Sequence, residues 1–122
     1  MKIVVVAIGG AVGAVARYAV TMLVARFWMG AFPLATFLIN VSGSFILGFF
    51  TTFVVEKTSL DPLWRLLVAT GFVGAYTTFS TFEYETQALT ETGATMIAIA
   101  NVLGSVIAGF AAVQLGVMFA RR

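Results

Sequence analysis

Long apolar runs separated by short polar clusters dominate this sequence. A helix that crosses a bilayer needs about 20 mostly apolar residues. Four stretches meet that requirement: about 3–25, 33–55, 62–87 and 94–119. Asp61 followed by Pro62 is typical of a helix start, where a capping side chain precedes a proline. The pattern predicts one transmembrane domain over residues 1–122, an all-α integral membrane fold with four transmembrane helices.

The composition favours the bilayer as the surroundings of this chain. Hydrophobic residues make up 61% of the 122 residues, charged residues make up 10%, and the mean hydropathy is +1.04. Ordinary globular domains are about one-quarter charged. This composition therefore excludes a soluble domain and a disordered chain. The net charge of only +2 argues against nucleic acid as a partner.

Missing residue types narrow the chemistry further. The sequence contains no Cys and no His, which excludes thiol nucleophiles, thiolate metal sites and Ser/His/Asp catalysis. Motifs of the HExxH and Walker types are absent as well. We therefore expect that the protein is not an enzyme.

Residues 61 positions apart resemble one another. Residues 40–49 match residues 101–110 at seven of ten positions, and residues 10–14 match 71–75 at four of five. Duplication and independent selection of small residues both explain this similarity. Each copy carries polar and small residues four apart, which share a helix face, and we expect these stripes to form helix contacts across subunits. The stripes are Asn40, Ser44 and Gly48, and Asn101, Ser105 and Gly109.

The third apolar stretch is a poor continuous helix. Glycines at 71 and 74 precede a run of β-branched and hydroxyl residues, and both kinds of residue weaken a helix. Backbone leaves helical geometry inside a membrane only where protein or a water-filled cavity covers it, and such breaks form ion sites. We expect a break near 74–78. The alternative is a glycine-rich packing contact in which the hydroxyls bond to carbonyls one turn earlier.

Residues 74–82, which read GAYTTFSTF, resemble the signature GGxTTFSTF of the CrcB/Fluc fluoride channels. The resemblance extends to the whole chain, through Gly10, Gly13 and Arg17 in the first stretch and Asn40 in the second. It implies a fluoride-selective channel of the bacterial inner membrane that passively exports fluoride and gives fluoride resistance. It also implies an antiparallel, dual-topology homodimer with two fluoride pathways and a structural sodium ion, Na⁺, at its centre.

The resemblance assigns roles to particular residues. It implies that Phe79 and Phe82 line the fluoride pathway, that Asn40 contacts it, and that backbone carbonyls of Gly74 and Thr77 bind Na⁺. Two positions depart from the family. Ala75 replaces the second signature glycine, and Asn101 stands where the family often has tyrosine.

The chemistry of these residues suits a small, strongly hydrated anion. A pore must replace the water around fluoride with hydrogen-bond donors, and aromatic ring edges carry partial positive charge. Phe79 and Phe82 therefore suit an anion without trapping it. The amide and hydroxyl donors that we expect along the pathway are Asn40, Ser80, Thr81, Asn101 and Ser105.

Three charged residues have open roles. Arg17 is either an anion attractor near a vestibule or an anchor that reaches the lipid headgroups. Glu83 and Glu85 are either interfacial residues at the end of the helix or, for Glu85, a gate or proton relay beside the anion route. We therefore take Arg17 and Glu85 as vestibule and gating candidates.

The basic residues are unevenly distributed between the two predicted faces of the membrane. With four spans, both termini and the 56–62 connection share one side. That side holds Lys2, Lys57, Arg65, Arg121 and Arg122, whereas the other holds Arg26, and Arg17 if it reaches outward. The positive-inside rule favours cytoplasmic termini. A dual-topology homodimer would balance its charges, so either the orientation is weakly enforced or an oppositely oriented paralogue is the partner.

Two other functions compete with a fluoride channel. A small dual-topology exporter of cationic drugs coupled to protons needs an acid embedded in the membrane, and no Asp or Glu precedes Glu56 or lies in the fourth stretch. A membrane anchor or assembly subunit would need no polar broken helix. Fluoride efflux from liposomes separates these functions.

Overall fold

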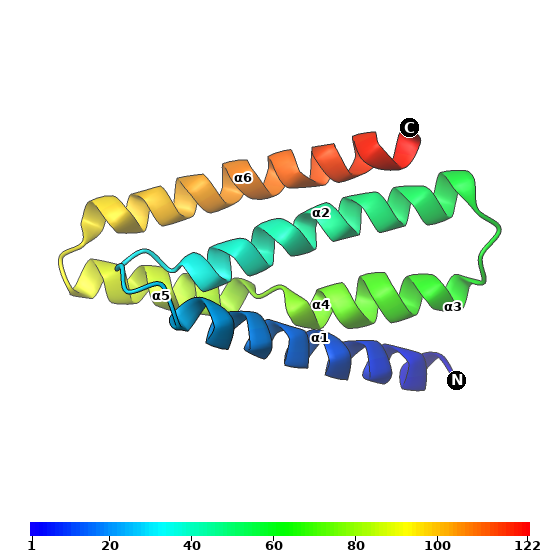
Figure 1. Cartoon of the computed structure of the whole chain (residues 1–122), viewed down its shortest axis with the longest axis horizontal. Coiled ribbons are helices and arrows are strands. Elements are labelled where there is room, and N and C mark those ends of the chain that lie inside the picture. Colours follow the sequence, from blue (N-terminus) through cyan, green and yellow to red (C-terminus); the bar gives the residue numbers. More distant parts are fainter.

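The computed structural model describes all residues, 1–122, and consists of helices joined by short loops (Figure 1). Both termini lie at the same end of the molecule (Figure 1). One of the segments, η1, is a π-helix. The elements in order are α1 (Lys2–Ala25), α2 (Leu34–Lys57), α3 (Pro62–Arg65), η1 (Leu66–Val73), α4 (Gly74–Tyr76), α5 (Phe79–Glu91) and α6 (Thr95–Arg121).

Three helices, α1, α2 and α6, are long and apolar enough to cross a membrane. The predicted third stretch is divided into α3, η1, α4 and α5, and its interruption at Thr77 and Thr78 lies within the expected break near 74–78. The run begins as the sequence indicates, because Asp61 Oδ1 accepts a hydrogen bond from the Leu63 N–H at 2.8 Å and Pro62 occupies the first turn.

Glycines bring α1 and η1 into backbone contact. A Cβ atom at Gly9 would overlap the carbonyl oxygen of Leu67, and one at Gly13 would overlap the carbonyl oxygen of Phe72. Gly71 on η1 is equally tight, because its Cβ would lie 2.8 Å from the Val6 carbonyl oxygen. The glycines of α1 therefore serve close packing, which positions η1 and the segment that follows it.

A second glycine contact joins α2 to α6. A Cβ at Gly48 would meet the Val113 carbonyl oxygen at 2.5 Å, and one at Gly109 would lie 3.7 Å from Ser44 Oγ. Our expectation that these stripes form contacts across subunits is therefore wrong for Gly48, which packs against α6 of the same chain, and stays a prediction for Ser44 and Gly109. The physical reason is that residues without bulky side chains let two long helices of the same chain approach closely.

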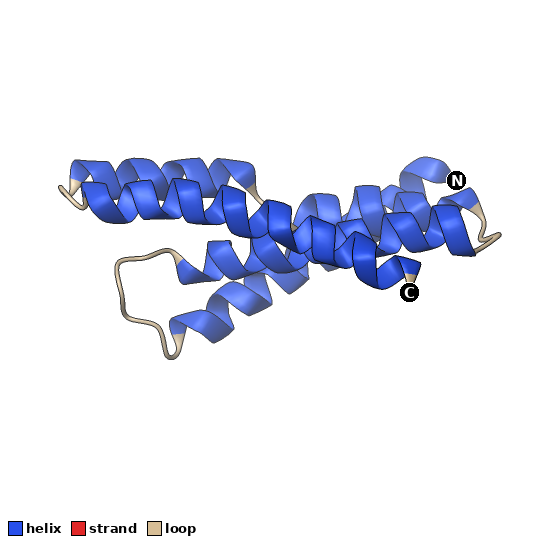
Figure 2. Cartoon of the chain, turned by 90° about the horizontal axis from the view of Figure 1, so that it is seen from above, coloured by secondary structure: helices blue, strands red, loops and turns tan.

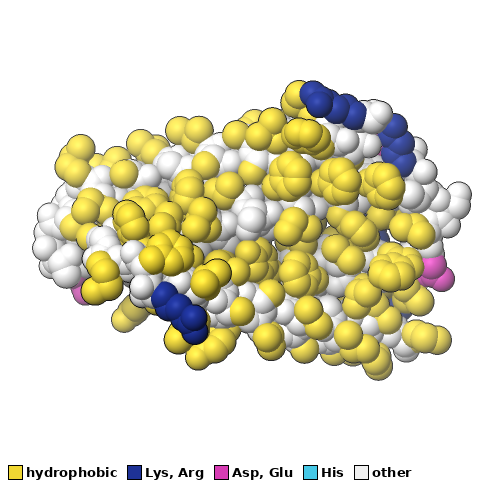
Figure 3. Space-filling model, in the orientation of Figure 1, with side chains coloured by type: hydrophobic (Ala, Val, Ile, Leu, Met, Phe, Trp, Pro, Cys, Tyr) yellow, Lys and Arg dark blue, Asp and Glu magenta, His cyan; other side chains and the backbone are white.

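Apolar side chains form most of the surface of the chain. Only 19 of 122 residues are buried, and many large hydrophobic side chains are exposed. Figure 3 shows them spread over the visible face, with few charged groups among them. At the end away from the termini, the turn between α1 and α2 diverges from the turn between α5 and α6 (Figure 2). Such a surface suits lipid or another apolar protein surface.

Candidate ion-binding site at the helix break

The run from α3 to α5 is interrupted at Thr77 and Thr78. Thr77 has φ −75° and ψ 157°, and Thr78 has φ −150° and ψ 113°, so both residues are extended. Branching at Cβ favours this geometry over the helix. Thr78 caps α5, because its Oγ1 accepts a hydrogen bond from the Thr81 N–H at 3.3 Å and lies 2.9 Å from Thr81 Oγ1.

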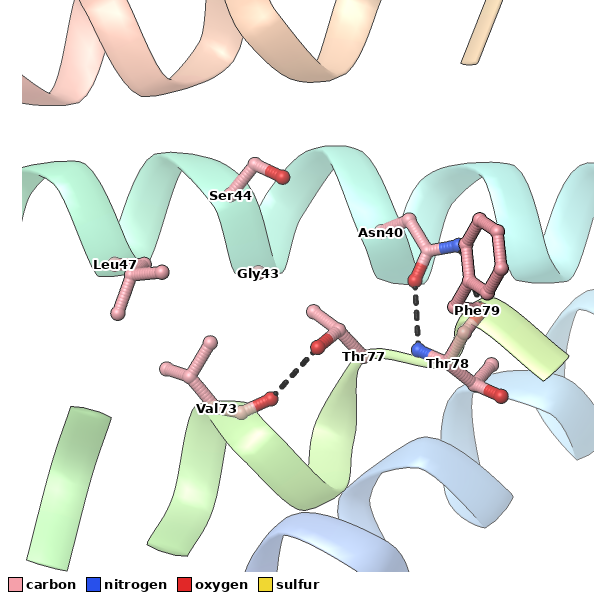
Figure 4. Close-up of a pocket in the computed structure, with 8 residues that line it drawn as sticks. All are labelled: Asn40, Gly43, Ser44, Leu47, Val73, Thr77, Thr78 and Phe79. Atoms are coloured by element: carbon pink, nitrogen blue, oxygen red, sulfur yellow. Dashed lines mark hydrogen bonds between the residues drawn. The ribbon is translucent and has the colours of Figure 1, made fainter. Parts of the chain in front are cut away.

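Asn40 on α2 holds the extended segment in place (Figure 4). Its Nδ2 donates to the Thr78 carbonyl oxygen at 3.1 Å, and its Oδ1 accepts from the Thr78 N–H at 2.8 Å. The amide thus replaces the helical acceptor that the Thr78 N–H lacks and adds a second donor to the Thr78 carbonyl, which as an N-cap carbonyl also begins α5. One Nδ2 hydrogen of Asn40 remains for another acceptor, because a side-chain amide has two donors.

The break changes the partners of two backbone carbonyls. In a continuous α-helix, the Thr78 N–H would bond to the Gly74 carbonyl and the Thr81 N–H to the Thr77 carbonyl. Here the Thr78 N–H donates to Asn40, and the Thr81 N–H donates to Thr78 Oγ1. The carbonyl oxygens of Gly74 and Thr77 therefore lose their helical donors, and that of Gly74 lies at the negative, C-terminal end of the helix before the break.

Two contacts that the sequence pattern does not indicate position the helix that leads into the break. Ser42 Oγ and Tyr76 Oη lie 2.9 Å apart and share a hydrogen bond between α2 and α4. A Cβ at Gly43 would overlap the Thr77 methyl group, so only glycine lets α2 approach Thr77 this closely. Ser42 and Gly43 lie next to the predicted stripe, but no spacing rule indicates which residues of another helix they meet.

The two phenylalanines of the signature are neighbours with different exposure. Their ring centroids are 5.9 Å apart and the rings are inclined at 44°. Phe82 is buried in its own chain, at 7% exposed, whereas Phe79 is 75% exposed. Ser80 and Thr81 are exposed as well. The first turn of α5 therefore exposes the Phe79 ring and the hydroxyls of Ser80 and Thr81 at the surface of the chain.

Asn101 and Ser105 lie away from the break. Asn101 is 1% exposed, and its Nδ2 donates to Thr86 Oγ1 at 2.9 Å. Ser105 Oγ donates to Asn101 Oδ1 at 3.3 Å. These bonds tie α6 to the middle of α5, so the structure separates this group from Asn40 and Thr78. Nothing in the sequence pattern distinguishes Thr86 from an ordinary helical threonine.

The gating candidates occupy different surroundings. Glu85 Oε1 accepts a hydrogen bond from Thr36 Oγ1 at 2.9 Å, and its Oε2 is buried without a partner. Arg17 is half-buried on α1 and takes part in no ion pair, since the only ion pair joins Arg121 to Glu56 at 2.8 Å. Glu85 therefore braces α5 against α2, and Arg17 keeps a free guanidinium.

A hollow of about 250 Å³ opens beside the break (Figure 4). Water occupies about 30 Å³ per molecule in the liquid, so the hollow has room for several waters or a hydrated ion. Neutral groups form its wall. The lining residues are Asn40, Gly43, Ser44, Leu47, Val73, Thr77, Thr78 and Phe79.

Comparison with known proteins identifies the family. The family described as "CrcB-like protein, Camphor Resistance (CrcB)" matches residues 4–117 of this chain. The chain belongs to this CrcB-like family. The resemblance noted in residues 74–82 is thereby confirmed, and with three apolar spanning helices the chain is a multi-pass membrane protein.

Individual relatives align over nearly all of their length. A protein of Solibacter usitatus named "Fluoride-specific ion channel FluC" is 44% identical over 122 residues, covering 100% of both chains. A protein of Acidobacterium capsulatum with the same name is 44% identical over 122 residues, covering 100% of this chain and 98% of the relative. One of Koribacter versatilis, also so named, is 45% identical over 108 residues, covering 88% and 86%.

Proposed function

We propose that this CrcB-like chain is a fluoride-selective channel that lets F⁻ leave the cytoplasm passively. The observation that carries the proposal is the full-length identity of 44% to a protein named as a fluoride-specific ion channel. The neutral donors at the helix break support it. An ion channel of this kind catalyses no reaction, so the protein is not an enzyme, and it lowers cytoplasmic fluoride without a coupled ion.

The residues at the break have the chemistry that such a pore needs. The free Nδ2 hydrogen of Asn40 and the hydroxyls of Ser80 and Thr81 are neutral donors, and the exposed edge of Phe79 is weakly positive. Binding by neutral groups replaces part of the hydration shell without holding the ion so tightly that conduction stops. We also include Asn101 and Ser105 in the proposed pathway as donors. They lie on α6, which packs against α2, the helix that carries Asn40.

The functional unit in this proposal is an antiparallel homodimer. Irregular backbone at membrane depth has to be covered by protein or to line a water-filled cavity. Here Gly74 and the Phe79 ring lie exposed beside the break. A second copy of the chain, inverted in the membrane, would cover this face and complete two pathways. An oppositely oriented paralogue is the alternative partner.

A structural Na⁺ ion at the centre of that dimer is part of the proposal. The carbonyl oxygens of Gly74 and Thr77 fit a hard cation, because their helical donors bond elsewhere. Two carbonyls from each subunit would supply four ligands at a two-fold axis. The C-terminal dipole of the preceding helix adds a negative potential there.

Fluoride efflux from liposomes tests the function directly. Purified protein in liposomes loaded with fluoride should release it rapidly on addition of a protonophore and a potassium ionophore, as read with a fluoride electrode. Liposomes that contain the same protein but are loaded with chloride should release almost no chloride. Absence of fluoride release, or equal release of both anions, would contradict the proposed function.

Two further experiments test the assembly. Chemical cross-linking in detergent should give a dimer, and monomer alone would contradict a dimeric unit. Reporter fusions at the C-terminus should be active on both sides of the membrane if the homodimer is antiparallel. Activity on one side only would favour the oppositely oriented paralogue, because Lys57 bonds to the Arg121 carbonyl at 3.3 Å, and Lys2 and Arg65 lie on the same predicted side of the membrane as these two residues.

A further inference from the structure

A second hollow continues the one beside the break toward the end of the molecule that holds the termini. Leu47 lines both hollows, and the second one follows α2 for another turn. Its volume is about 520 Å³, which is room for many waters. Its lining residues are Leu47, Gly48, Thr51, Thr52, Arg65, Ala69, Thr70, Val113 and Val117. We call the two hollows together the groove; α2 and η1 line both hollows, and α6 lines only the second.

The outer part of this groove is polar in a way that helix packing does not require. Thr51, Thr52 and Thr70 place three hydroxyls around it, and Arg65 adds a guanidinium. Thr51 Oγ1 is buried and has no hydrogen-bond partner in the chain. A buried hydroxyl without a partner costs free energy of about 1–3 kcal/mol, so a ligand or water in the groove would stabilise it.

The charge at the mouth favours anions. Arg65 also lines the hollow at the N-terminal end of α3, together with Lys2 and Asp61. Asp61 opposes the two cations, but its Oδ1 already accepts the Leu63 N–H that caps α3. Arg65 forms no ion pair, in contrast to Arg121. The mouth therefore carries two basic groups against one acid, and its guanidinium is free to attract an anion.

We propose that this groove is the route by which fluoride reaches the break from the termini end, with Arg65 as the anion attractor at its mouth. The three threonine hydroxyls then donate to the ion or to its water along the way to Asn40. This inference rests on the proposed function, since it assigns the access route and an electrostatic residue to that same site. It gives Arg65 a role separate from that of Arg17, which lies on α1.

The salt dependence of fluoride flux tests the role of Arg65. Arg65→Gln should slow efflux by about tenfold at about 0.01 M ionic strength, where the Debye length is about 30 Å. The deficit should nearly vanish at about 1 M of an impermeant salt, where that length is about 3 Å. Arg65→Glu should slow efflux further at low salt. The variants should elute in detergent as the parent does, which separates slow flux from misfolding.

Arg122→Gln is the matched control. Arg122 lies at the same end, with its guanidinium 5.0 Å from the Phe119 ring centre, and lines neither hollow. It should change efflux less than twofold. If Arg65→Gln and Arg65→Glu conduct like the parent at both salt concentrations, or if Arg122→Gln is equally slow, Arg65 is not the attractor. Failure of the parent itself to conduct would instead contradict the proposed function.

Thiol labelling tests the groove without measuring flux. The chain contains no Cys, so a single introduced thiol reports its own surroundings. Thr52→Cys and Thr70→Cys should react within minutes with a water-soluble methanethiosulfonate added to liposomes, because thiolates form only where water reaches. Ile107→Cys, on the exposed apolar face of α6, should stay unlabelled. Absence of labelling at both groove positions would overturn the access route even if the channel conducts.

Discussion

The side-chain amide of Asn40 satisfies both backbone polar groups of Thr78, donating to its carbonyl at 3.1 Å and accepting from its N–H at 2.8 Å. This pair of bonds links α2 to the helix break and determines where the first turn of α5 lies. Asn40 therefore has a structural role and a proposed role in binding fluoride at the same time. The two roles use different hydrogens of the amide.

Asn40→Asp should abolish fluoride flux. A carboxylate keeps an acceptor for the Thr78 N–H but loses the donor to the Thr78 carbonyl, and it places a negative charge beside an anion route. Liposome efflux measures the effect of the negative charge on fluoride flux. Thermal unfolding in detergent measures the loss of the bond to the Thr78 carbonyl. Val55→Ala, at an exposed position on the same helix, should leave both properties nearly unchanged. Parent-like flux in Asn40→Asp would exclude Asn40 from the pathway.

Phe79→Ile and Phe82→Ile should both cut fluoride flux severely, because isoleucine fills the space but lacks the positive ring edge. Their stability should differ. Phe79 is 75% exposed and Phe82 is 7% exposed, so only Phe82→Ile should lower the free energy of unfolding, by less than about 1.5 kcal/mol. Phe79→Tyr should retain partial flux. If both isoleucine variants conduct like the parent, the aromatic-edge mechanism is wrong.

Replacing sodium by a large organic cation should abolish flux or dissociate the dimer. The proposed site consists of neutral carbonyl oxygens of Gly74 and Thr77, which suit a small hard cation and cannot bind a bulky one. Efflux and gel filtration in N-methylglucamine salts provide the measurement, with lithium as the positive control. Full activity without either sodium or lithium would exclude a structural cation.

Gly116→Ala should destabilise the chain strongly, whereas Gly104→Ala should not. A Cβ at Gly116 would overlap the Phe45 carbonyl oxygen and lie 2.7 Å from the Phe49 nitrogen, whereas nothing lies within 4 Å of a Cβ at Gly104. Both glycines are on α6, so the pair is a matched control. Gly104→Ala should stabilise by up to about 1 kcal/mol through helix propensity. Equal melting temperatures in detergent would contradict the close α2–α6 contact.

Asn101→Val and Thr86→Val should each destabilise the α5–α6 pair, because each removes the 2.9 Å bond between Asn101 Nδ2 and Thr86 Oγ1. A double-mutant cycle should give a coupling free energy of about 0.6 kcal/mol, the average for such bonds in membranes. Ser105→Ala should be milder, since its hydroxyl donates at the longer distance of 3.3 Å. Zero coupling would show that the bond contributes nothing to stability.

The interruption of the third stretch was predictable because its cause is local. Two glycines and a run of threonines weaken a helix in any context, and the structure has extended residues at Thr77 and Thr78. The role of Asn101 was less accessible. Its spacing from Ser105 placed both on one face, which is how they lie, but it did not indicate that this face meets Thr86 on α5.

The class of protein, the extent of the long apolar helices and a weak point near 74–78 follow from the sequence alone, because each depends on hydrophobicity and backbone preference within one segment. What each helix face contacts depends on the folded arrangement of the helices. This arrangement places Gly48 against α6 of the same chain, Asn40 against Thr78, and Arg65 in the groove along α2. Helical periodicity specifies which residues share a face, whereas the neighbour of that face depends on how closely the glycines allow the helices to approach.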